Sequence, residues 1–211
     1  MATELAALLG LPRAAASAPP EPVPTDKAGW RAWAEAQMRS RPTPQRQLHA
    51  RVLAAEIAAL ADRLAARVVG LYSPLGSETA TRDLANLLIV NGIALAWPRL
   101  LPQGEAMEFA LAAGPASLQP RPRSRLLEPV GAALDPRSID LLLLPSLAVR
   151  PDGKRLGRGG GYFDRFLPAL RPDAITIAVS PLAHVVDWQQ PAAHDVPLHL
   201  VCSENGLAAL G

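Results

Sequence analysis

The chain has 211 residues, 49% of them hydrophobic and 19% charged, a composition typical of a globular protein large enough to bury a sizeable core. Its formal net charge of +2 and its aromatic content of 4% argue against a broad nucleic-acid-binding surface. The single cysteine, Cys202, excludes an intrachain disulfide and a cysteine-based zinc cluster. It is expected to be a small core residue, and it favours a reducing cytoplasm as the location.

Residues 1–25 are rich in alanine and proline, which predicts a disordered tail with a short helix near Leu5–Leu11. A secretory signal peptide has basic residues before its apolar stretch, whereas Glu4 precedes Arg13 here. The longest apolar run, Ile139–Val149, is too short to span a membrane. Residues 26–211 are therefore expected to fold as a single domain with no membrane partner.

Helices and strands alternate along that domain. Asp26 can cap the first helix, and Gly92 can end the third. Apolar residues at helical spacing predict the long second helix, and a continuous apolar run predicts a buried parallel strand at 139–144. The expected helices cover 27–39, 43–67 and 78–91, with a short one before Pro168. The expected strands cover 68–73, 93–97, 107–112, 139–144, 174–179 and 198–202, with a loop over 114–129. This order predicts a three-layer α/β/α sandwich with a mostly parallel sheet.

The segment 153–167, GKRLGRGGGYFDRFL, contains five glycines and four cationic side chains. Glycine lets a backbone approach an anion closely, and Lys154, Arg155, Arg158 and Arg165 can supply the positive charge that a phosphate requires. The segment lies between an apolar strand and a helix start, where α/β proteins bind ligands. These features favour a phosphate site, and a flexible basic surface loop is the alternative.

Two common phosphate-binding motifs do not fit this segment. Arg155 follows Gly153-Lys154, where a P-loop has serine or threonine, and Tyr162 stands where the third glycine of a dinucleotide motif would fall. A site here is therefore of another kind.

The same segment resembles the Gly-x-Arg-Leu-Gly-x-Gly-x-Gly-Tyr-Tyr-Asp-Arg hallmark of the 5-formyltetrahydrofolate cyclo-ligases, also called methenyltetrahydrofolate synthetases. The chain departs from it only at Phe163, which replaces the second tyrosine. The other pieces that match in order are Lys27 with Arg31, Tyr72 with Glu78 and Thr81, Glu128-Pro129, and His194-Asp195 with Ser203-Glu204. The resemblance covers about Lys27 to Asn205.

The resemblance implies a fold shared with sugar-phosphate isomerases and CoA transferases. It also implies conversion of 5-formyltetrahydrofolate, with or without a polyglutamate chain, and ATP to 5,10-methenyltetrahydrofolate, ADP and phosphate with Mg²⁺. We expect a cytoplasmic monomer with no nucleic-acid partner.

Roles follow from the resemblance residue by residue. It implies that ATP is held by Lys27, Arg31, Arg155, Gly157, Arg158, Gly159, Gly160, Gly161, Tyr162, Phe163 and Asp164. Arg158 and Lys27 would be catalytic, by stabilising charge on the transferred phosphoryl group. Asp164 would bind Mg²⁺, and Tyr72, Glu78 and Tyr162 would contact the folate.

Taken without the resemblance, these residue types have structural interpretations. Lys27 and Arg31 fit a solvated helix face, Tyr162 a core aromatic residue, Asp164 a salt bridge to an arginine and Glu78 a helix N-terminal charge. Trp97 and Trp188 are expected in the core rather than in a folate pocket. His49, His184 and His194 are assigned no chemistry.

Two positions depart from the family pattern. His199 stands where members commonly carry an aspartate that serves as a second metal contact, so Asp195 or Glu204 is an alternative ligand. Val149-Arg150 replaces a usual Phe-Asp pair, and the added positive charge would favour polyglutamylated folate. These departures leave two other functions open. One is a catalytically weak relative that binds folate or nucleotide as a sensor or buffer, and the other is an ATP-dependent enzyme with a different substrate.

Overall fold

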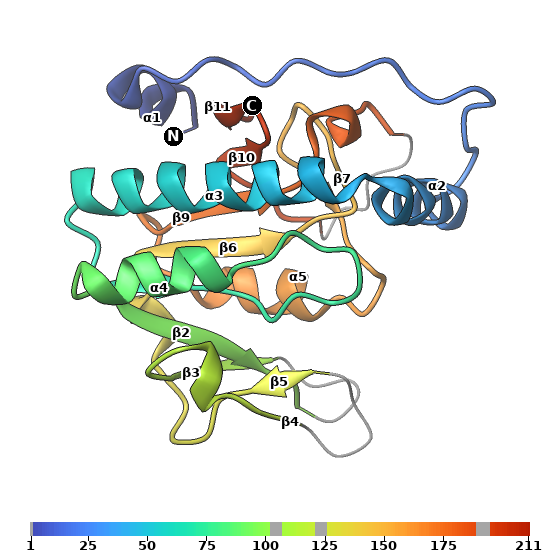
Figure 1. Cartoon of the computed structure of the whole chain (residues 1–211). Coiled ribbons are helices and arrows are strands. Elements are labelled where there is room, and N and C mark those ends of the chain that lie inside the picture. The colour runs from blue at the N-terminus through green and yellow to red at the C-terminus, as the bar shows by residue number, and fades with distance from the viewer. Residues whose placement is uncertain (1, 102–106, 121–125, 189–194) are drawn as a thin grey trace.

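The computed structural model describes residues 2–101, 107–120, 126–188 and 195–211, and it places a mostly parallel sheet between layers of helix (Figure 1). Seven strands in these ranges form the sheet in the order β11-β10-β9-β6-β1-β2-β3. Their bounds are β1 Val68–Gly70, β2 Ala94–Arg99, β3 Glu108–Leu111, β6 Leu141–Pro145, β9 Ile175–Val179, β10 Leu200–Ser203 and β11 Gly206–Ala209. Five neighbouring strands, from β10 to β2, are parallel, and β3 and β11 pair antiparallel at the two edges.

The helices and two small hairpins complete the described fold. The α-helices are α1 Ala2–Leu9, α2 Lys27–Ser40, α3 Thr43–Arg63, α4 Arg82–Val90 and α5 Tyr162–Phe166. Short 3₁₀ turns cover Pro115–Ser117, Pro136–Ser138, Leu167–Ala169 and Leu182–His184. One hairpin joins β4 Gln119–Pro120 to β5 Leu127–Glu128, and the other joins β7 Ala148–Val149 to β8 Arg155–Leu156. No helix in the described ranges is both long and apolar enough to cross a bilayer.

The central strand β6 shows why the sheet is buried on both faces. Successive side chains of a strand point to opposite faces. Leu141 and Leu143 therefore pack in the cluster that contains residues of α3 and α4, whereas Leu142 and Leu144 pack in the cluster that contains Phe166 of α5. Figure 1 shows α3 and α4 in front of the sheet, with α5 behind it. The predicted α/β/α sandwich with a mostly parallel sheet is confirmed, and the finer likeness to isomerases and transferases stays a prediction.

Several predicted elements are present with different bounds. The carboxylate of Asp26 accepts a hydrogen bond from the Gly29 N–H at 2.7 Å, which confirms the predicted cap of α2. The fourth helix begins at Arg82 rather than at residue 78, because side chains hold the preceding turn open. The Tyr72 hydroxyl donates to the Thr79 carbonyl, and the Thr81 hydroxyl donates to the Tyr72 carbonyl. Such local hydrogen bonds compete with helix formation.

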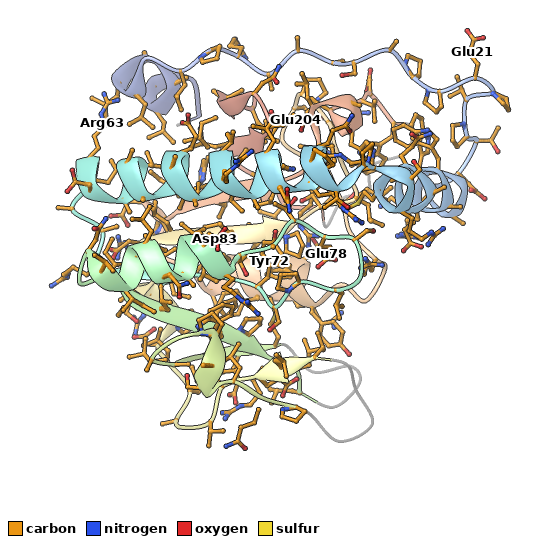
Figure 2. The ribbon with its side chains drawn as sticks, viewed as in Figure 1. Glu21, Arg63, Tyr72, Glu78, Asp83 and Glu204 are labelled. Carbon is orange, nitrogen blue, oxygen red and sulfur yellow. The ribbon has the colours of Figure 1, made fainter. Side chains whose placement is uncertain are left out.

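The N-terminal segment differs from the predicted disordered tail. Ala6 and Leu9 of α1 are buried in the main core cluster, and the Arg63 guanidinium donates to the carbonyl oxygens of Leu8 and Leu9 (Figure 2). Further along, the Ala14 N–H donates to the Ala209 carbonyl at 2.7 Å. Residues 6–14, which overlap the short helix predicted near Leu5–Leu11, therefore pack on the domain through apolar contacts and through pairing with the edge strand β11. The domain boundary at residue 26 remains a prediction.

Candidate functional site

A cavity of about 230 Å³ lies where β1, β6 and β2 end. Parallel strands bring their carboxyl ends to one edge of a sheet, so the loops that follow β1 and β6 meet there. Figure 2 shows Tyr72 and Glu78 on the segment between β1 and α4. All the predicted site residues line this cavity: Lys27, Arg31, Tyr72, Glu78, Arg155, Gly157, Arg158, Gly159, Gly160, Gly161, Tyr162, Phe163 and Asp164.

The glycine-rich loop is shaped by the β7–β8 hairpin and by α2. Leu147 and Leu156 pair through a backbone hydrogen bond of 2.8 Å, which brings the loop back over the end of β6. Gly159 has φ of +97°, and a Cβ there would lie 3.5 Å from the Arg31 guanidinium carbon. Arg31 Nε donates to the Gly157 carbonyl at 2.9 Å. The positive φ favours glycine at 159, whereas the contact with Arg31 is of ordinary van der Waals length and would not by itself exclude a side chain.

Arg158 extends from this loop to two carboxylates on other segments. Its Nε donates to Glu78 Oε1 and its Nη1 donates to Glu35 Oε1, both at 2.8 Å. Glu78 is also fixed through Oε2, which accepts from the Leu75 N–H at 2.9 Å. Sequence reasoning missed Glu35. The signal that could have found it is its position one helical turn after Arg31, on the face of α2 that carries Lys27.

The resemblance implies that Arg155 contacts ATP, and the structure places its guanidinium in an ion pair inside the protein. It is buried, and its Nη2 donates to Asp164 Oδ1 at 3.0 Å. Burial lowers the pKa of Arg155, while Asp164 and Asp195 act in the opposite direction. The guanidinium also lies 5.2 Å from the Phe163 ring centroid. The structure thus contains the salt bridge that was the alternative interpretation of Asp164, and both partners line the cavity.

Asp195 supplies a second carboxylate to the cavity. Its Oδ2 accepts from Lys27 Nζ at 3.0 Å, and Lys27 lies 5.4 Å from the ring of buried Trp188. His199 is elsewhere: its Nδ1 accepts from the Thr176 N–H at 3.0 Å, where β9 and β10 begin. Of the alternatives for a second acidic contact, Asp195 is the one that lines the cavity. Within the described residues, no three acidic, histidine or cysteine side chains gather as a ready metal site.

The rest of the cavity is largely apolar. Its lining from the β2–β5 region and the β6–β8 region consists mainly of Pro98, Leu100, Met107, Leu126, Leu127, Pro145, Leu147 and Leu156, together with Glu128. Tyr72 is 2% exposed, and burial raises its pKa well above the ordinary value, so it is a neutral hydroxyl. Tyr162 packs beneath Arg165, whose guanidinium carbon lies 5.1 Å from the ring centroid. The cavity therefore joins a charged wall from α2 and the glycine-rich loop to an apolar wall that suits a flat ring system.

The model of the 5-formyltetrahydrofolate cyclo-ligase family matches residues 25–204. The chain belongs to this family. It is 31% identical over 184 residues to the 5-formyltetrahydrofolate cyclo-ligase of Mycolicibacterium smegmatis, covering 82% of this chain and 91% of that protein. A stretch of 29 residues is 66% identical to the mitochondrial 5-formyltetrahydrofolate cyclo-ligase of Arabidopsis thaliana, covering 14% of this chain and 10% of that protein.

Two solved structures share the fold of this family member. The 5,10-methenyltetrahydrofolate synthetase of Aquifex aeolicus superposes with a TM-score of 0.75 at 22% identity, covering 87% of this chain and 92% of that one. The 5,10-methenyltetrahydrofolate synthetase of Mycoplasma pneumoniae superposes with a TM-score of 0.71 at 20% identity, covering 85% and 99%.

Arg150, one of the two departures from the family pattern, does not add free charge to the cyclo-ligase site. Its Nε pairs with Asp152 at 3.1 Å, and its Nη1 pairs with Asp187 and with the Trp188 carbonyl. It does not line the cavity. The prediction that Arg150 adds unpaired positive charge beside the loop is therefore wrong. That charge no longer supports a preference for polyglutamylated folate.

The remaining candidate side chains have structural surroundings. Trp97, Trp188 and Cys202 are buried and do not line the cavity. His49 Nε2 lies 3.2 Å from the Cys202 carbonyl, and His184 Nδ1 lies 2.7 Å from the Leu147 carbonyl. Burial lowers the pKa of both histidines, so both are neutral near pH 7. His194 lies outside the described residues.

Proposed function

We propose that this chain is an ATP- and Mg²⁺-dependent 5-formyltetrahydrofolate cyclo-ligase that produces 5,10-methenyltetrahydrofolate, ADP and phosphate. The observation that carries this proposal is one cavity lined both by Arg158, Arg31 and Lys27 and by an apolar wall. Such a cavity can hold a polyphosphate beside a flat ring, which is the arrangement the reaction needs. Family membership supports the same conclusion.

In the proposed reaction, the formyl oxygen attacks the γ-phosphorus and ADP leaves. N10 of the folate then bonds to the formyl carbon and loses its proton, the ring closes and phosphate departs with the former formyl oxygen. Arg158 and Lys27 would stabilise negative charge on the transferred group, and Arg31 would orient the triphosphate from the same side. Glu78 would accept hydrogen bonds from the folate.

The donors at the charged wall suit magnesium. Mg²⁺ prefers carboxylate oxygens, takes few protein ligands and keeps several waters. Asp164, with Asp195 nearby in the same lining, would hold the ion, and phosphate oxygens would complete its coordination. The bound ion would supply positive charge that stabilises the negative charge of the transferred phosphoryl group.

The proposal is tested by mixing purified protein with 5-formyltetrahydrofolate, Mg²⁺ and ATP and following the near-ultraviolet absorbance of methenyltetrahydrofolate. The band should grow only when both ATP and Mg²⁺ are present, and chelation should stop it. Folate and ATP binding without any band would instead support the weak sensor or buffer. That alternative was motivated by His199 and Arg150, neither of which lines the cavity. We further propose a monomer in the cytoplasm, and light scattering would measure the oligomeric state.

A further inference from the structure

The single positive charge of Arg158 is paired with two carboxylates. Its guanidinium donates to Glu78 and to Glu35, and Nη2 lies 3.4 Å from the Leu75 carbonyl. All three guanidinium nitrogens therefore have protein acceptors, and two carboxylates face one cation. To take a phosphate with paired N–H groups, as arginine usually does, Arg158 must release at least one of these acceptors.

The two carboxylates differ in how firmly they are held. The Glu78 side chain is 7% exposed, and its second oxygen is fixed by the Leu75 N–H. The Glu35 side chain is 32% exposed on α2, and its second oxygen has only a 3.4 Å pair with Arg39, whose side chain is 66% exposed. If the Glu78 side chain moved away from Arg158, it would lose a buried hydrogen bond. The Glu35 carboxylate, in contrast, can exchange Arg158 for water at little cost in free energy.

We propose that Glu35 is a positioning residue that holds Arg158 in the free enzyme and is displaced from it by the polyphosphate of ATP. Glu78 stays paired with Arg158 Nε when ATP binds, so the guanidinium keeps its orientation while Nη1 exchanges Glu35 for a phosphate oxygen. Breaking the Glu35–Arg158 pair then costs free energy that weakens ATP binding. This inference rests on the proposed function, because it takes Arg158 to be a phosphate contact.

The test is a set of calorimetric titrations with a non-hydrolysable ATP analogue and Mg²⁺. Glu35→Gln keeps the side-chain size but removes the charge, and it should bind the analogue about twofold to fivefold more tightly, as expected for a partly exposed ion pair. The KM for ATP should fall by a similar factor, while the KM for 5-formyltetrahydrofolate and the melting temperature stay unchanged. Unchanged or weaker binding would overturn the proposal.

Two further variants separate this exchange from a general effect of charge on α2. In an Arg158→Gln background, Glu35→Gln should no longer tighten binding, and an equal gain there would contradict the exchange. Arg39→Gln removes the other partner of Glu35 without touching Arg158 and should not tighten binding. If wild-type protein does not bind the analogue at all, the proposed function itself fails. Binding without the Glu35→Gln gain overturns only this inference.

Discussion

The two ends of the parallel sheet both hold ionic groups, but they use them differently. At the amino end, Asp140 Oδ2 accepts from the N–H groups of Arg67 and Val68 at 2.6 and 2.7 Å, and Oδ1 accepts from Arg171 at 2.6 Å. At the carboxyl end, Arg158 joins Glu35 and Glu78, side chain to side chain, from three separate segments.

The difference lies in the partners and in what surrounds them. Asp140 ties neighbouring strands together largely through backbone donors, and it does not line the cavity. Arg158 lines the cavity, and its partly exposed partner Glu35 can be exchanged for a phosphate group of a ligand. Ionic groups of similar chemistry are therefore structural at one end of the sheet and available for binding at the other.

The substitution Arg158→Gln gives the largest expected effect at the carboxyl end of the sheet. We expect kcat/KM for ATP to fall about 100-fold or more, because a donor aimed at the transferred phosphoryl group is lost. The unfolding free energy should fall by about 1 to 3 kcal/mol, because the Glu35 pair is partly exposed but the buried Glu78 carboxylate loses its charged partner. Steady-state kinetics and urea unfolding measure the two effects. Arg137→Gln, which breaks an exposed pair with Asp135, is the matched control and should change neither. Normal ATP kinetics with a large loss of stability would make Arg158 structural.

Asp164→Asn should affect both activity and stability. The change leaves buried Arg155 without its charged partner, which should lower the unfolding free energy by about 3 kcal/mol. Activity should fall, and the Mg²⁺ concentration that restores half of it should rise. Chemical denaturation and Mg²⁺ titrations of the rate measure these changes. Asp173→Asn provides the control, because Asp173 is exposed in its pair with Arg171. An unaltered Mg²⁺ requirement would restrict Asp164 to the salt bridge.

Asp140→Asn should lower stability without changing activity, which is the opposite of the effect expected for a residue of the site. We expect a loss of about 2 kcal/mol of unfolding free energy at pH 7 with an unchanged KM for ATP. Burial raises the pKa of Asp140, but hydrogen bonds from Val68, Arg171 and Arg67 outweigh it and hold the pKa below the ordinary value.

The sign of the pH effect follows from that lowered pKa. The folded protein favours the carboxylate, so its stabilisation is fully present above the unfolded pKa of about 3.9 and is lost as the pH falls through the folded value. Urea unfolding from pH 7 downwards should show the wild-type advantage constant until about pH 4 and then shrinking. A raised KM for ATP in the Asp140→Asn variant would show that the amino end of the sheet also contributes to ATP binding.

His199→Asp should have the smallest effect on activity. This change restores the aspartate common in the family, but residue 199 contacts Thr176 at the amino end. The Mg²⁺ dependence of the rate should therefore stay the same, with a stability change of about 1 kcal/mol from the altered hydrogen bond. Mg²⁺ titrations of the two proteins compare them directly. A clearly lower Mg²⁺ requirement in the variant would place residue 199 in the metal site.

Strong periodic patterns predicted the main elements of the fold. The apolar runs at 139–144 and 174–179 correspond to β6 and β9, and the helical spacing after Thr43 corresponds to α3. The hairpin β7–β8 and the edge strand β11 were missed, because strands of two to four residues carry little periodicity. The short helix predicted near Leu5–Leu11 corresponds to α1, but its packing was not predicted, because the contacts are with distant β11 and α3.

At the site, the glycine-rich motif and the family resemblance predicted many of the polar and glycine residues of the cavity, but neither its apolar lining nor the pairing of its charged groups. The glycine-rich motif places Arg155 and Arg158 only three positions apart, yet one is buried against Asp164 and the other extends to α2. Their directions depend on the β7–β8 hairpin and on the position of α2, which local sequence does not contain. The same reason applies to Asp195, whose partner Lys27 is 168 positions away.

That separation has a consequence for how the protein becomes active during its synthesis. Lys27 and Arg31 leave the ribosome early, whereas the loop that contacts Arg31 lies 126 positions later and Asp195 later still. Because chains emerge from the N-terminus, α2 must wait for almost the whole polypeptide before its charged face is covered. Nascent fragments that lack β9 and β10 would also lack Asp195, so the charged wall of the cavity is completed only by nearly full-length chains.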